Sequence, residues 1–92
     1  MRAYVLVDCS LDKARELVNS LRDHENVLAA DLINGPHSAV FVVQANESQE
    51  IAKTVLFNIG RQGYLRNVTV YLALDEKKYG SRELLHQKVR LK

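Results

Sequence analysis

Hydrophobic and polar positions follow the same order twice along the chain. Each half has a short apolar run, a polar residue suited to cap a helix, an apolar stripe at helical spacing, and a second apolar run. The expected strands are residues 3–9, 26–33, 38–45 and 65–74, and the expected helical stripes are residues 11–21 and 51–59. The pattern therefore predicts the order strand, helix, strand, strand, helix, strand.

Local signals mark the ends of the two expected helices. Ser10 is a typical N-cap residue for the first helix. Asn46 and Gln49 have the spacing of a capping box at the start of the second helix. Gly60 and Gly63 offer stops at its C-terminal end.

This order of elements limits the possible sheet topology. Right-handed crossovers make the two strands of each half parallel to one another. Interlocking the two halves gives a sheet in which all neighbouring strands are antiparallel. We therefore expect an α+β fold, the ferredoxin-like βαββαβ split sheet, with four antiparallel strands and two helices on one face.

Both faces of this expected sheet are apolar. In the first strand, Ala3, Val5 and Val7 share one face, while Tyr4 and Leu6 share the other. The third and fourth strands have the same character. Two helices cover only one face, and a second copy of the same sheet is the simplest cover for the other. The pattern predicts a homodimer formed through the sheet, as in a dimeric α/β barrel.

Length and composition place the chain among ordinary globular domains. It has 92 residues, of which 47% are hydrophobic and 26% charged, and these values argue against disorder. No apolar run is long enough to cross a membrane, and the N-terminus has no secretory signal. A single cysteine cannot form an internal disulfide, which fits a reducing compartment. We expect a cytoplasmic protein without membrane contacts.

Charge is distributed unevenly along the chain. Residues 1–76 hold seven Lys or Arg and ten Asp or Glu, whereas residues 77–92 hold six Lys or Arg and one acid. We expect residues 1–76 to form the domain and residues 77–92 to form a basic tail, as an added strand or a short helix. An acidic domain is a poor surface for nucleic acid. We expect the tail to pair with the acidic domain, because Val89 and Leu91 alternate with basic residues as in an edge strand.

Candidate chemistry is sparse. The three histidines are far apart, and Cys9 has no partner at a metal-ligand spacing, so no metal site is expected. There is no phosphate-binding or dinucleotide-binding glycine motif, so no cofactor is expected. Asp8 and Asp31 form either a general-acid pair or two strand-end carboxylates at a polar edge, and the second interpretation is the more usual one. We expect no catalytic residues and no enzyme.

The loop between the second and third expected strands has two interpretations. It consists of Asn34, Gly35, Pro36, His37 and Ser38. Asn-Gly and proline are turn signals, and composition alone favours a structural hairpin turn. Alternatively, the backbone N–H groups beside Gly35 bind a carboxylate, and His37 and Ser38 add hydrogen-bonding groups.

Three stretches resemble the effector (ligand-binding) domain of the Lrp/AsnC family of feast/famine regulators. They are AYVLVDC, V-x-x-A-x-L-I-x-G-P-x-x-x-V-F-V-V and I-x-x-x-G-x-x-x-x-x-T-V-Y-L-A-L, and together they span residues 3–74. The resemblance implies a βαββαβ domain that dimerises through its sheet and often assembles into octamers. It also implies that a small amino-acid-like effector binds between subunits.

The resemblance implies a set of ligand-binding residues, namely Asn34, Gly35, Pro36, His37, Ser38 and Thr69. The family loop usually carries an aspartate where this chain has Ser38, so a carboxylate suited to an ammonium group is missing. Full-length members begin with a helix-turn-helix, whereas this sequence starts at the effector strand. We therefore expect a stand-alone member that does not bind DNA directly and modulates transcription by co-assembly with a regulator.

Two other functions are compatible with the same fold. A small dimeric α/β-barrel enzyme, of the monooxygenase or isomerase type, needs a roomy pocket with converging polar groups. A protein- or peptide-interaction module, such as a peptide-binding chaperone, would use the apolar sheet face as a monomer.

Overall fold

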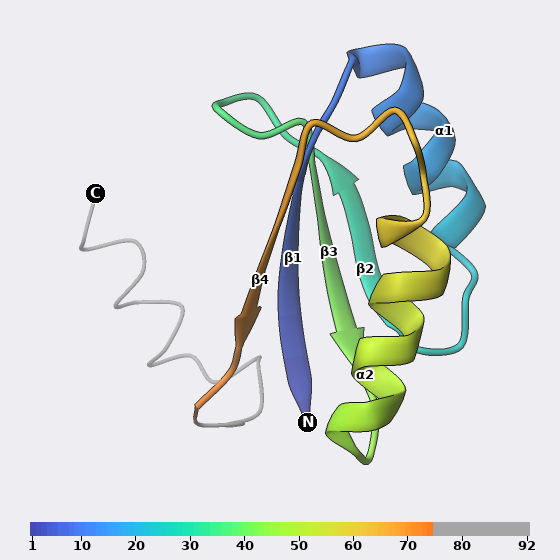
Figure 1. Cartoon of the computed structure of the whole chain (residues 1–92), viewed down its shortest axis with the longest axis vertical. Helices are drawn as coiled ribbons and strands as arrows, with labels where there is room; N and C mark the ends of the chain where they lie inside the picture. Colours follow the sequence, from blue (N-terminus) through green and yellow to red (C-terminus); the bar gives the residue numbers. More distant parts are fainter. Residues whose placement is uncertain (75–92) are drawn as a thin grey trace.

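The computed structural model describes residues 1–74, and its elements follow the expected order (Figure 1). They are β1 (Arg2–Asp8), α1 (Leu11–Leu21), β2 (Val27–Leu32), β3 (Ala39–Gln44), α2 (Ser48–Val55), a π-helical turn η1 (Leu56–Gly60) and β4 (Asn67–Leu72). The fourth strand is shorter at both ends than the expected 65–74. The basic tail at 77–92 and its expected strand or short helix lie outside the described residues.

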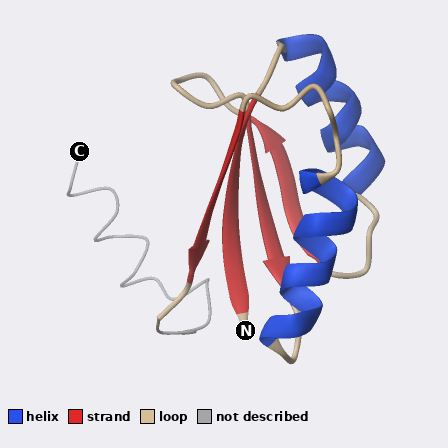
Figure 2. Cartoon of the chain, viewed as in Figure 1, coloured by secondary structure: helices blue, strands red, loops and turns tan. Residues whose placement is uncertain are grey.

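The four strands form one sheet in the order β2-β3-β1-β4, and every neighbouring pair is antiparallel. Helix α1 connects β1 to β2, and α2 connects β3 to β4, so each connection passes over a strand from the other half. Both helices lie on the same side of the sheet (Figure 2). The predicted α+β, ferredoxin-like fold is confirmed.

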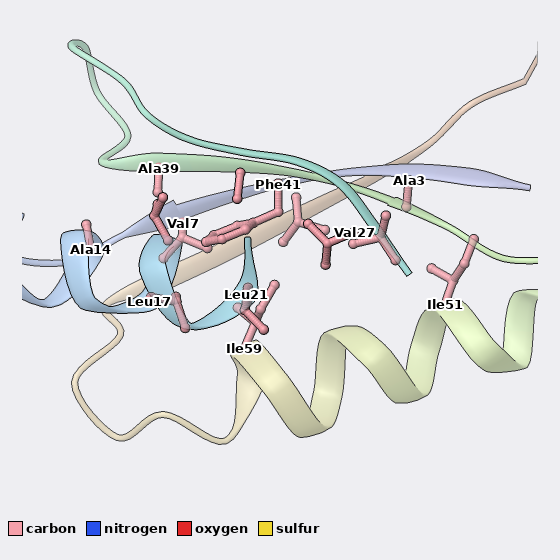
Figure 3. Close-up of a cluster of buried hydrophobic side chains, with 14 of the residues drawn as sticks. Ala3, Val7, Ala14, Leu17, Leu21, Val27, Ala39, Phe41, Ile51 and Ile59 are labelled. Carbon is pink, nitrogen blue, oxygen red and sulfur yellow. The ribbon is translucent and has the colours of Figure 1, made fainter. Parts of the chain in front are cut away.

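The core lies between the sheet and the two helices (Figure 3). Every second residue of β1 and β3 is completely buried on this side: Ala3, Val5, Val7, Ala39, Phe41 and Val43. Helix α1 contributes Ala14, Leu17, Val18 and Leu21 to the same core. Fully burying a Val, Leu or Phe side chain contributes about 1.5–3 kcal/mol, so this face holds the fold together.

The buried face of α2 differs from the expected apolar stripe. Ile51 and Ile59 are buried as predicted, but Ala52 and Leu56 are exposed, and the polar Thr54 is buried. The Thr54 hydroxyl donates a hydrogen bond to the carbonyl of Glu50 at 2.9 Å. A threonine that returns its hydroxyl to the helix backbone is tolerated in a core, and a hydropathy pattern does not identify it.

The helix caps agree with the sequence only at α1. The Ser10 hydroxyl accepts a hydrogen bond from the Lys13 backbone N–H at 3.5 Å. The predicted capping box at Asn46 is wrong, because α2 begins one residue later and Glu47 is its N-cap, without a side-chain cap bond. The helical run continues through η1 and ends at Gly60, as predicted. Neither helix in residues 1–74 is long and apolar enough to cross a membrane.

Candidate functional site

The side of the sheet opposite the helices carries apolar side chains, and we call it the open face. Alternation along β1 places Tyr4 and Leu6 on this face, opposite the buried core positions. The strand register sets two rows across β3, β1 and β4: Val40–Leu6–Thr69 and Val42–Tyr4–Tyr71. Within residues 1–74, no helix or strand covers these rows (Figure 2). The apolar second face predicted from the sequence is therefore present and open.

The loop between β2 and β3 projects beyond one end of the sheet, where β1 ends and β4 begins (Figure 1). Ser38 attaches it there. The Ser38 backbone N–H donates to the Val7 carbonyl at 2.8 Å. Its hydroxyl donates to the Cys9 carbonyl at 2.6 Å and accepts from the Cys9 N–H at 3.2 Å. Ser38 thus joins the start of β3 to the end of β1, and these bonds engage its hydroxyl in the structure.

The tip of the loop is exposed at Asn34, Gly35 and Pro36. A Cβ atom added at Gly35 would meet no atom of the described chain within 4 Å, and the Gly35 φ lies outside the left-handed region. Residues 1–74 therefore give no steric or backbone reason for a glycine at this position. The space beside it is open to a ligand or to another subunit.

His37 lies next to this tip, and its environment differs from the sequence expectation. The loop interpretation with a ligand uses His37 as a hydrogen-bonding group, and the structure shows that the residue is half-buried. Its Nδ1 atom is shielded from solvent and has no hydrogen-bond partner within the described chain. Buried polar atoms without partners are rare in folded proteins and call for an explanation. His37 is therefore the loop residue with an unsatisfied hydrogen-bonding atom.

Thr69 lies on the open face of β4 rather than in the loop. It pairs with Leu6 across the β1–β4 ladder and is half-buried. Strand β1 separates it from β3, to which the loop leads. The structure thus gathers residues 34–38 into one loop and places Thr69 on the adjoining sheet face. A ligand-binding role for these six residues stays a prediction.

An ion pair at the same end of the sheet was not anticipated. The Arg66 guanidinium donates to the Asp8 carboxylate at 3.1 Å, and the Arg66 backbone N–H donates to the Asp8 carbonyl at 2.9 Å. Asp31 lies on β2, and β3 stands between β2 and β1, so Asp8 and Asp31 do not form a carboxylate pair. Only strand pairing brings Asp8 and Arg66 together, because nothing in their spacing links them.

Two of the hollows that residues 1–74 line are on the helix side. One, of about 240 Å³, lies between the α1–β2 loop and α2, and the Asn26 amide donates there to the Thr54 hydroxyl at 3.1 Å. The other, of about 600 Å³, lies between α2 and β4, and its lining contains no titratable side chain. Cys9 is buried, and burial raises the pKa of its thiol, which suits an inert core residue. Among residues 1–74, no cluster of His, Cys, Asp or Glu could hold a metal ion.

Comparison with known proteins identifies the fold. No protein-family model and no curated protein sequence matches the chain. Among solved structures, TTHA0845 from Thermus thermophilus superposes with a TM-score of 0.74 at 18% identity, covering 84% of this chain and 96% of that protein. The βαββαβ unit therefore accounts for nearly the whole length of that protein.

The same fold recurs in longer proteins. The transcriptional regulatory protein PF0864 from Pyrococcus furiosus, a member of the AsnC family, has a TM-score of 0.70 at 19% identity, covering 86% of this chain and 53% of that one. The transcriptional regulator NMB0573 from Neisseria meningitidis, solved as an L-Met complex, has a TM-score of 0.69 at 19% identity, covering 85% and 52%. The chain spans about half the length of these regulators. It therefore has the fold that Lrp/AsnC-family regulators contain within roughly half of their chain.

Proposed function

We propose that this chain is a ligand-sensing domain of the Lrp/AsnC type that assembles through its open face and binds an amino-acid-like effector at the loop of residues 34–38. The assembly is a homodimer that can associate further, up to an octamer. It works in the cytoplasm and influences transcription by co-assembly with a DNA-binding regulator rather than by binding DNA itself.

The observation that carries this proposal is the open face, which no helix or strand of residues 1–74 covers (Figure 2). Strands β1 and β3 present Leu6, Val40 and Val42 as neighbouring apolar side chains at its centre. Contiguous apolar patches of this kind are typical of protein interfaces. A two-fold axis through the face would bury the same patch of both copies. The loop of residues 34–38 extends past one end of this face, so it would lie close to the interface (Figure 1).

The loop supplies the features that an effector site needs. The open space at Gly35 admits a ligand close to the backbone, and a side chain there would obstruct it. The unpartnered Nδ1 of His37 is a hydrogen-bonding atom without a use within residues 1–74. One regulator with this fold is an L-Met complex, which supports an amino-acid-like effector for this chain as well.

An enzymatic function and direct DNA binding receive less support from the structure and the sequence. An enzyme of this fold needs polar groups that converge in its main pocket, whereas the hollow between α2 and β4 is lined mostly by apolar side chains. Direct DNA binding has little support from a domain in which acidic residues outnumber basic ones.

Assembly is tested first, by native mass spectrometry at micromolar concentration. The expected species has at least twice the mass of the 10.5 kDa chain. Val42→Lys places a charge at the centre of the open face and should dissociate the oligomer. Leu11→Lys is the control, because Leu11 is an exposed apolar residue on α1, on the other side of the sheet. Detection of the single chain alone, or equal effects of both variants, would contradict assembly through the open face.

Effector binding is tested by thermal shift with L-Met and the other nineteen amino acids. A ligand that binds only the folded state adds RT ln(1 + [L]/Kd), about 2.7 kcal/mol at a hundredfold excess over Kd. Gly35→Gln should abolish the shift and leave the far-UV spectrum and the oligomer mass unchanged. Gly63→Gln is the matched control, since Gly63 is an equally open loop glycine. His37→Ala should weaken binding by about 1 kcal/mol for one lost hydrogen bond. A ligand bound equally by the wild type, Gly35→Gln and His37→Ala would show that the loop is only a turn.

A further inference from the structure

Helix α2 and strand β4 enclose an apolar groove on the helix side of the sheet. Helix α2 packs against β1 and β3. Of the inward side chains of β4, Val68 packs against the core, whereas Val70 and Leu72 are exposed. Val70 is 44% exposed and Leu72 53% exposed, and Leu56 on the helix side of the groove is 56% exposed. The groove has a volume of about 600 Å³ and is lined by Ser48, Gln49, Ile51, Ala52, Val55, Leu56, Gly60, Val70 and Leu72.

The chain continues from the end of this groove. Leu72 is both the last residue of β4 and part of the groove lining, and the described chain ends two residues later at Leu74. The 18 residues 75–92 follow directly. From Ser48 to Gly60 the groove runs along twelve residue steps of helix, or about 18 Å at 1.5 Å per residue. Eighteen residues span about 27 Å as a helix and about twice that when extended, so they are long enough to reverse and follow the whole groove.

The chemistry of residues 75–92 matches that of the groove. The segment carries four aliphatic side chains, Leu84, Leu85, Val89 and Leu91. Residues 75–92 hold six Lys or Arg and three acids, whereas residues 1–74 hold seven Lys or Arg and eight acids. Glu47 and Glu50 lie at the N-terminal end of α2, where the groove begins. Apolar side chains therefore suit the groove floor, and the surrounding Lys and Arg suit its acidic end.

We propose that residues 75–92 of this chain fold back over the groove between α2 and β4 and place their aliphatic side chains against Ala52, Leu56, Val70 and Leu72. This contact lies on the opposite side of the sheet from the open face. It therefore leaves the proposed dimer interface free, and each proposal can fail without the other.

Disulfide trapping in the full-length chain tests the contact. Ala52→Cys is combined with Leu85→Cys or with Leu91→Cys, and mild oxidation is followed by non-reducing mass analysis. Asn19→Cys with the same tail cysteines is the control, because Asn19 is exposed on α1 outside the groove. The native Cys9 is 3% exposed and reacts slowly for that reason.

A docked tail raises the effective concentration of its cysteine at Ala52, so at least one groove pair should form an intrachain disulfide about tenfold faster than its control. Equal rates for the groove and control pairs would overturn the proposal. A disulfide that links two chains would also overturn it, and would assign the groove to the tail of a second copy.

Amide hydrogen exchange provides a second measurement without cysteines. Replacing both Leu84 and Leu85 by Asp should release the tail and accelerate exchange in β4, at residues 67–72. Lys88→Asp is the control that alters tail charge alone and should leave most of the protection in place. Unchanged exchange in β4 with the Leu84→Asp, Leu85→Asp double variant would contradict the proposed cover.

Discussion

Strands β1 and β4 are neighbours with similar apolar sequences but very different surroundings. Val5 of β1 and Val70 of β4 face each other in the ladder and point to the same side of the sheet. Val5 is completely buried, whereas Val70 is 44% exposed. The difference comes from the helices, because α1 packs on β2 and β3, and α2 packs on β3 and β1. An apolar strand pattern thus reports that a side chain suits burial, not which element buries it.

Strand β4 is more exposed than the other apolar strands of the sheet. From Val70 to Leu72, β4 is exposed on both sides of the sheet, whereas β1 and β3 are fully buried on the helix side. Our two proposals assign one cover to each side. A second copy covers the open face, and residues 75–92 cover the groove beside α2. Strand β4 is therefore the part of the fold that depends most on contacts outside the described domain.

The sharpest test of the comparison removes the same atoms from each strand. Val5→Ala should lower the free energy of unfolding by about 2–3 kcal/mol, because it removes fully buried methyl groups and leaves a cavity. Val70→Ala should cost about 1 kcal/mol, because much of that side chain is already in contact with water. Urea denaturation of both variants measures the two losses. Equal losses would contradict the difference in burial.

Side-chain contacts join β1 to its neighbours, including one from Ser38 beside β3 and one from Arg66 beside β4. Of these two, the contact on the β3 side should contribute more to the free energy of unfolding. Ser38→Ala should cost about 1–2 kcal/mol, because it leaves both backbone groups of Cys9 without their hydroxyl partner. Arg66→Met should cost less than about 1 kcal/mol, because the Arg66 side chain that forms the ion pair with Asp8 is 65% exposed.

Denaturation at low and high salt distinguishes the two contacts. The Arg66→Met loss should shrink as salt screens the ion pair, and the Ser38→Ala loss should not. A salt-independent loss at Arg66 would show that its contribution is not electrostatic.

The smallest expected effect is a dependence on alkaline pH. Burial raises the pKa of the Cys9 thiol, with smaller opposing effects from Arg66, which lowers it, and Asp8, which raises it. Below the ordinary value of 9.0, the thiol is protonated in both states and its contribution to stability is complete. As the pH rises above that value, the unfolded chain loses the proton first, so stability falls until the folded thiol also ionises. Urea denaturation from about pH 8 to about pH 10 should show a steeper fall for the wild type than for Cys9→Ala. Equal slopes would contradict a raised thiol pKa.

Burial also raises the pKa of the Tyr64 hydroxyl, and nearby Cys9 and Glu16 add to this while Lys13 opposes it. Ionisation of Tyr64 should therefore also lower the free energy of unfolding, at a higher pH than ionisation of Cys9. Tyr64→Phe distinguishes it from the cysteine, since only the later part of the fall should change.

Much of the candidate site could be located from the sequence, but its geometry could not. The Asn-Gly-Pro turn signal correctly marks the loop between β2 and β3. The burial of His37 Nδ1 was not predictable, because a loop composition does not show which side-chain atoms the folded chain shields from solvent. The two bonds of Ser38 to Cys9 join residues 29 positions apart, and no local pattern encodes that pairing.

By itself the sequence determined the elements and the two apolar faces of the sheet. Alternation at Ala3, Val5 and Val7, and the Ser10 cap, are local features that act over one strand or one helical turn. The tertiary structure alone decided which apolar residues are buried. It turned Thr54 inward and Ala52 outward on α2, and it left Val70 and Leu72 of β4 exposed. These outcomes depend on how whole helices dock on the sheet, and docking is decided by the sum of contacts between segments distant in sequence.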